Sequence, residues 1–127
     1  MALPEYKTKK TRNWQKLSDK IPYKSYVALL NQTGGNAPTA TAMYNDLGEI
    51  TYGYTAAGEY TIESNALFAE NKTFFTIQQT QDNAPASANI IVYRIDDSTL
   101  GVKVLVEGSA YTDGFMLGVP IEIRVYN

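Results

Sequence analysis

The chain contains neither cysteine nor histidine among its 127 residues. Without cysteine it can form no disulfide and offers no thiolate to a metal. Without histidine it lacks the commonest general base and the commonest metal ligand. No apolar run approaches the roughly 20 residues that a membrane-spanning helix needs, so no membrane span is predicted. These absences disfavour most enzyme and metalloprotein classes and leave structural or binding roles.

The remaining side chains form no catalytic motif. Neither Ser-x-x-Lys nor Gly-x-Ser-x-Gly occurs in the sequence. Asp96 and Asp97 are adjacent carboxylates, and we interpret them as residues of a turn rather than as an acid–base pair. Oxygen ligands in the loops, at residues 82–83, at Asp96 with Asp97 and at Asp113, leave calcium binding open. We therefore predict that the protein is not an enzyme, needs no cofactor and has no dedicated metal site.

The end of the chain alternates strictly between apolar and polar positions. Val119, Ile121, Ile123 and Val125 lie on one face, and the side chains between them lie on the other. This period of two predicts a strand with one buried face. Similar stretches, separated by turn residues, predict strands at 23–32, 39–44, 49–54, 59–64, 73–80, 87–95, 99–107 and 119–126. We predict an all-β domain over residues 23–127, an antiparallel β-sandwich of jelly-roll type.

Residues 1–22 differ from this domain and form an N-terminal basic arm. Residues 1–24 hold seven basic and two acidic residues, a net charge of +5, whereas the rest holds four basic and eleven acidic residues, a net charge of −7. Residues 11–21 could form a short helix, because Trp14, Leu17 and Ile21 would share one face. A helix of this length needs a partner surface to be stable.

Three interpretations of the arm stay open: contact with nucleic acid, docking on a partner protein, and disorder. The acidic domain would repel nucleic acid, so we do not predict a nucleic-acid partner. Partner docking is one of the two preferred interpretations. It would use the arm's cationic and apolar side chains: Lys7, Lys9, Lys10, Arg12, Trp14 and Leu17.

Two features of the domain bear on binding. The chain contains ten tyrosines. Three of them, Tyr52, Tyr54 and Tyr60, fall near one predicted hairpin. They could contact a glycan or a protein, although strands favour tyrosine for cross-strand packing anyway, and we prefer that interpretation. In addition, two predicted strands carry apolar residues on both faces, which predicts a symmetric homo-oligomer that covers the second face. These residues are Ile90, Ile91, Val92 and Tyr93 on one strand and Val102, Val104, Leu105 and Val106 on the other.

Residues 23–40, YKSYVALLNQTGGNAPTA, resemble a pattern of small proteins from bacteriophages and prophages of Bacteroidetes-type hosts. Asp46-Leu47-Gly48-Glu49-Ile50, Gly58-Glu59-Tyr60 and the ending 119–126 fit the same pattern. The resemblance spans roughly residues 23–127, excludes the arm, and carries over no catalytic or ligand-binding residue.

The resemblance implies a virion-associated structural protein, such as a spike, a head fibre or a decoration protein. Virion appendages of this kind are often trimers, so it implies a homotrimer located in the virion. The arm would bind a capsid or tail protein, and the β domain would project outward. The alternative is a glycan-binding module that recognises a bacterial cell surface through the tyrosine-rich hairpin.

Overall fold

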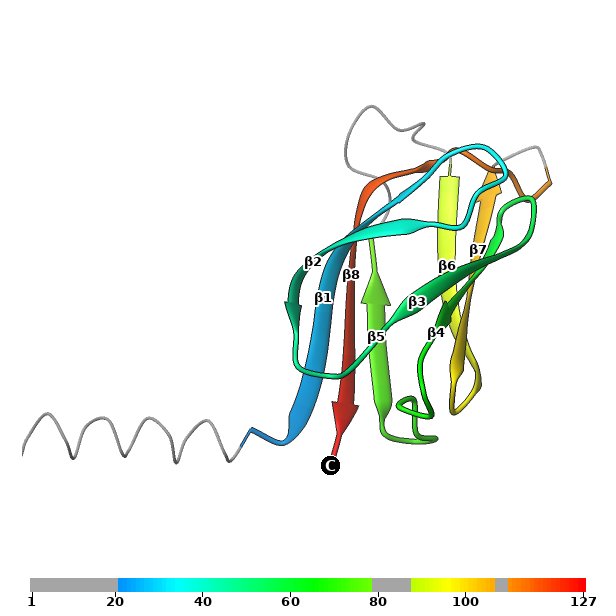
Figure 1. Cartoon of the computed structure of the whole chain (residues 1–127). Helices are drawn as coiled ribbons and strands as arrows, with labels where there is room; N and C mark the ends of the chain where they lie inside the picture. Colours follow the sequence, from blue (N-terminus) through cyan, green and yellow to red (C-terminus); the bar gives the residue numbers. More distant parts are fainter. Residues whose placement is uncertain (1–20, 79–87, 107–109) are drawn as a thin grey trace, which may run out of the picture.

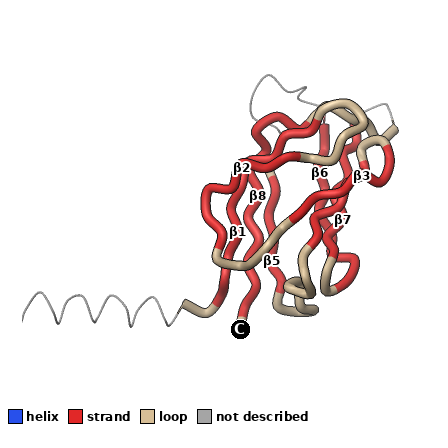
Figure 2. The backbone as a smooth tube through the Cα atoms, in the orientation of Figure 1, coloured by secondary structure: helices blue, strands red, loops and turns tan. Residues whose placement is uncertain are grey.

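The computed structural model describes residues 21–78, 88–106 and 110–127, which form two β-sheets packed face to face (Figure 1). The described residues contain no helix, and strands make up most of their backbone (Figure 2). The strands are β1 (Tyr23–Gln32), β2 (Thr39–Asn45), β3 (Thr51–Ala56), β4 (Glu59–Glu63), β5 (Thr73–Ile77), β6 (Ala88–Asp96), β7 (Thr99–Val106) and β8 (Met116–Tyr126).

Each sheet has four antiparallel strands. Sheet A has the order β2-β1-β8-β5, and sheet B has the order β3-β4-β7-β6. The prediction of an all-β antiparallel sandwich is confirmed. The jelly-roll topology is not confirmed: β1–β2, β3–β4 and β6–β7 are hairpins within one sheet, whereas a jelly roll sends most consecutive strands to opposite sheets. Strand periodicity predicts strands but does not predict which strands pair.

The core lies between the sheets and follows the alternation in the sequence. In β1 the side chains of Tyr26, Ala28 and Leu30 are buried, and the residues between them face outward. In β8, Ile121 and Ile123 are buried opposite Ala28 and Tyr26. Sheet B closes the core with the buried apolar residues of its two central strands: Tyr60, Ile62, Leu100, Val102 and Val104.

The observed strands lie close to the predicted ones. The first strand has the predicted bounds, and the hairpins at Gly58 and at Asp97 occur as predicted. The last strand begins at Met116, three residues earlier than predicted, because its first residues pair with the end of β1. The predicted ends of the strands at 73–80 and 87–95 reach into residues 79–87, which lie outside the described residues. The arm through residue 20 and its predicted helix lie outside them too.

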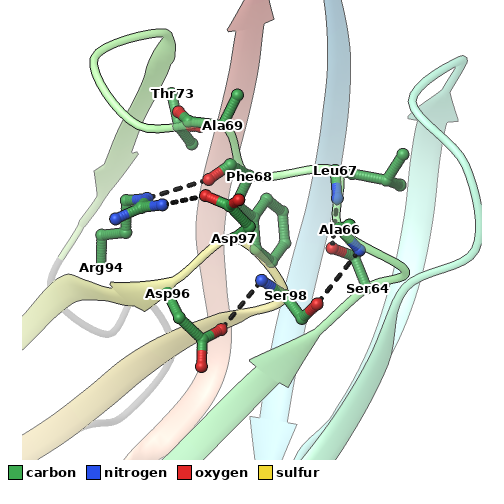
Figure 3. A network of polar contacts seen from close by, with 10 residues as sticks. All are labelled: Ser64, Ala66, Leu67, Phe68, Ala69, Thr73, Arg94, Asp96, Asp97 and Ser98. Atoms are coloured by element: carbon green, nitrogen blue, oxygen red, sulfur yellow. Dashed lines mark hydrogen bonds and ion pairs between the residues drawn. The ribbon is translucent and has the colours of Figure 1, made fainter.

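The loop between β4 and β5 closes one end of the core. The Phe68 side chain is fully buried, and the amide of Phe68 donates to the Asp97 carbonyl over 2.8 Å. Arg94 reaches over from β6, donating from Nε to the Phe68 carbonyl (2.9 Å) and pairing with the Asp97 carboxylate (Figure 3). This network ties the β6–β7 turn to the loop after β4.

Candidate functional site

Asp96 and Asp97 serve the β6–β7 turn. The Asp96 carboxylate accepts a hydrogen bond from the Ser98 amide (2.9 Å), and Asp97 pairs with Arg94 (Figure 3). Ser98 in turn accepts a hydrogen bond from the Ala66 amide through its hydroxyl oxygen (3.1 Å). The interpretation of the two aspartates as turn residues is confirmed, and the network gives no sign of an acid–base pair.

A carboxylate at the opposite end of the sandwich is held by three groups of the β3–β4 hairpin. Asp113 accepts hydrogen bonds from the hydroxyls of Tyr54 (2.8 Å) and Tyr60 (2.6 Å) and from the Gly58 amide (2.8 Å). Gly58 lies at the turn of the β3–β4 hairpin with φ of +68°, and a Cβ there would lie 2.3 Å from the Thr112 nitrogen. Glycine is therefore required where the 110–114 segment crosses the hairpin. We call Asp113, Tyr54, Tyr60 and Gly58 the Asp113 clamp.

The clamp shifts the pKa values of its members. Burial alone would raise the pKa of Asp113, but the hydrogen bonds from Gly58, Tyr60 and Tyr54 outweigh it and lower that pKa below its usual value. Burial and the bond to Asp113 raise the pKa of Tyr60. The bond to Asp113, then burial, raise the pKa of Tyr54. At neutral pH the clamp therefore contains one carboxylate and two neutral phenols, an arrangement that holds loops together.

Replacing Asp113 by Asn is expected to destabilise the protein at neutral pH by about 1–3 kcal/mol, because the amide cannot accept all three hydrogen bonds. The folded-state pKa of Asp113 lies below its unfolded value, so its contribution is complete above the unfolded pKa and disappears as the pH falls through the folded one. Melting curves recorded from neutral to acidic pH should show that the gap in melting temperature between wild type and Asp113→Asn closes in acid. The exposed Glu70→Gln is the control, and a gap that is independent of pH would contradict the assignment.

The candidate calcium ligands do not converge. Asp113 bonds to the turn before β4, whereas Asp96 and Asp97 lie beside the loop after β4, at the other end of that strand. Residues 82–83 lie outside the described residues. Within the described ranges, no three acidic side chains gather in a way that could hold a metal ion. The described part of the chain also has no helix of the length and apolar character needed to cross a membrane.

The three tyrosines of the predicted contact site do not form one exposed group. Tyr60 is buried, and Tyr52 is half-buried, with its hydroxyl 2.6 Å from that of Tyr26 in the facing sheet. Burial, and then the bond to Tyr26, raise the pKa of Tyr52. Of the three, only Tyr54 is exposed, and its hydroxyl donates a hydrogen bond to Asp113. For these residues the structure agrees with the interpretation as packing and cross-strand aromatics.

The outer face of sheet B carries an apolar patch. Its members have between 36% and 51% of their surface exposed, and we call them the sheet-B patch: Ile91, Tyr93, Ile95, Leu105 and Tyr111. Lys103 lies among them, with Nζ 5.4 Å from the ring centre of Tyr93 and 5.3 Å from that of Tyr111. The second apolar face predicted for residues 90–93 and 102–106 is thus present, and β6 forms the edge of its sheet.

The outer face of sheet A carries a second group, which we call the sheet-A patch. The Arg124 guanidinium lies over the rings of Tyr23 (4.7 Å) and Phe74 (5.8 Å), and Tyr23 stacks at a tilt on Tyr126 with ring centres 5.1 Å apart. Arg124 also donates from Nε to Glu122 over 2.8 Å. Sequence alone does not reveal this group, because its residues come from β1, β5 and β8, three strands distant in the chain.

The residues of the predicted docking arm, Lys7, Lys9, Lys10, Arg12, Trp14 and Leu17, lie outside the described residues. The described part of the chain begins at Ile21, directly before β1. The arm therefore stays a prediction from charge and composition. Comparisons of the chain with protein-family models, with curated proteins and with solved structures each return no match.

Proposed function

We propose that the protein is a structural component of a bacteriophage virion, a spike, head fibre or decoration protein, that assembles as a homotrimer. The observation that carries this proposal is the sheet-B patch on an antiparallel sandwich. A sandwich has one interior, which this chain fills with the buried faces of both sheets. A further apolar face is a common mark of association, and a second copy of the chain would cover it.

The resemblance of residues 23–127 to phage proteins supports the virion location. A trimer about a threefold axis would bring the sheet-B patch of each copy against its neighbour. The arm would then emerge at the end of the sandwich where β1 begins, and its cationic residues would bind an acidic surface of a capsid or tail protein. Mass spectrometry of purified particles tests the location, because the chain must be present in them.

The homotrimer is expected to have about three times the 14.1 kDa mass of the chain in light scattering at micromolar concentration. Ile95→Glu places a charge in the patch, away from the cross-strand pair of Ile91 and Lys103, and is expected to yield a folded monomer, because burying an unpaired charge in an interface is costly. Met43→Glu is the matched control, since Met43 is exposed on β2 of the other sheet. A monomeric wild type, or equal loss of mass in both variants, would contradict the proposal.

The glycan-binding alternative has its own supporting observation in the sheet-A patch. Phe74 is 48% exposed and Tyr126 37% exposed, and both lie on the outer face beside Arg124. Aromatic rings next to a guanidinium can stack on sugar rings and bond to their hydroxyls. A sheet-A patch that stays open in the oligomer and binds a host surface polysaccharide would favour this function.

A further inference from the structure

A recess lies where the arm joins the sandwich. Its lining includes the side chains of Ile21, Tyr23 and Tyr44 and the polar residues Lys24, Ser25, Asp46 and Asn127. Ile21 is 49% exposed and Tyr44 54% exposed, so both apolar groups are available for contact. The end of β2 and the start of β1 form its walls. They are joined by a hydrogen bond that the Asp46 amide donates to the Ser25 carbonyl (3.1 Å).

One residue that lines the recess, Ile21, also belongs to the apolar face predicted for a helix in the arm, which we call the apolar stripe. Ile21 is the last of the three residues, Trp14, Leu17 and Ile21, that would share a face of a helix. The backbone just after Ile21 is held in place, because the Asn127 amide donates to the Pro22 carbonyl over 2.9 Å. The two remaining apolar side chains of the stripe, Trp14 and Leu17, therefore come shortly before a residue that already lines the recess.

The length of chain limits where these side chains can lie. Leu17 precedes Ile21 by four residues, a distance of about 6 Å along a helix and at most about 14 Å when extended. Either distance keeps Leu17 beside the recess of its own chain. A second copy would have to bring its arm to the same place against this local competition, so the arm of the same chain is the favoured occupant.

Charge supports the same occupant. The end of the sandwich where β1 begins carries more acidic than basic residues. The acidic ones are Asp46, Glu49, Glu63, Glu70, Asp96 and Asp97, and the basic ones include Lys24, Lys72 and Arg94, of which Arg94 pairs with Asp97. Lys16 and Lys20 flank the apolar residues of the arm and would face this acidic surface. Asp46 lines the recess itself, and its carboxylate accepts a hydrogen bond from the Ser25 amide (2.7 Å).

We propose that this recess is the docking site for residues 14–20 of the same chain, with Leu17 and Trp14 packed against Ile21, Tyr23 and Tyr44. Docking would order the root of the arm and direct the cationic residues 7–12 away from the sandwich. The proposal concerns the free protein and does not depend on the virion function.

Trp14 is the only tryptophan of the chain, so its fluorescence reports on the arm alone. In the free full-length protein we expect emission shifted to the blue of an isolated peptide of residues 1–20, with weaker quenching by iodide. Tyr44→Ala should lower the ratio of docked to free arm by about tenfold. Met43→Ala, a neighbour on β2 that does not line the recess, should leave the emission unchanged.

Leu17→Ala provides a second variant that leaves the sandwich untouched, and it should also move the emission toward that of the peptide. High salt should weaken docking only in part, because the apolar contact persists. Peptide-like emission in the wild type, or an equal effect of Tyr44→Ala and Met43→Ala, would overturn the proposal. A blue shift that disappears on dilution would also overturn it, because it would assign the arm to a neighbouring copy.

Discussion

Removal of residues 121–127 is expected to leave the chain without a cooperative fold. These residues form most of β8, which pairs with β1 on one side and β5 on the other and so joins the strands of sheet A. Ile121 and Ile123 are buried in the core, and each contributes on the order of 1.5–3 kcal/mol by burial alone. The lost burial and the lost pairing together are comparable with a typical stability of about 5–15 kcal/mol. Circular dichroism and thermal melting of the truncated chain measure this.

A point substitution separates packing from chain length. Ile123→Ala is expected to cost about 2–5 kcal/mol in free energy of unfolding, through lost burial and the cavity that remains. Glu122→Ala on the outward face of the same strand is the control, since Glu122 is half-exposed. A truncated chain that melts cooperatively near the temperature of the full chain would show that β8 is dispensable.

Removal of residues 1–20 is expected to leave the sandwich folded and oligomeric but to abolish its incorporation into particles, if the arm is the anchor. The core of the described chain is made by residues from Tyr26 onward, and we expect these residues to hold the sandwich together without the arm. Melting temperature and light scattering test the first expectation. Mass spectrometry of purified particles, with the full chain as reference, tests the second.

Charge reversal of the arm tests how it docks. Replacing Lys7, Lys9, Lys10 and Arg12 by Glu should weaken incorporation if the receiving surface is acidic, and raised salt should act in the same direction. Lys72→Glu is the matched control, because Lys72 is an exposed cation of the sandwich itself. Incorporation of the arm-less protein at the level of the full chain would rule out anchoring by the arm. Collapse of the sandwich on deletion would show that the arm is part of the fold.

The strands of this protein could be read from its sequence because each strand has one buried face. A residue in the interior must be apolar, whereas its neighbour in the strand need not be. The order Ile121, Glu122, Ile123 therefore indicates which of these side chains are buried and which faces outward. The same reasoning placed the turn at Asp97, since the carboxylate and hydroxyl side chains there satisfy the local backbone. The apolar face outside the core was predictable for the same reason.

The tertiary structure alone decided which strands pair and which polar groups meet. Asp113 is bonded to Tyr54 and Tyr60 across 59 and 53 residues, and no local pattern encodes a contact over such a distance. The sequence favoured packing over ligand contact for Tyr60 but left both open, and the structure places its ring in the core, because tyrosine suits a buried site once its hydroxyl has a partner. Local periodicity thus determined the elements of this protein, while strand order and the Asp113 clamp arose from packing between segments far apart in the chain.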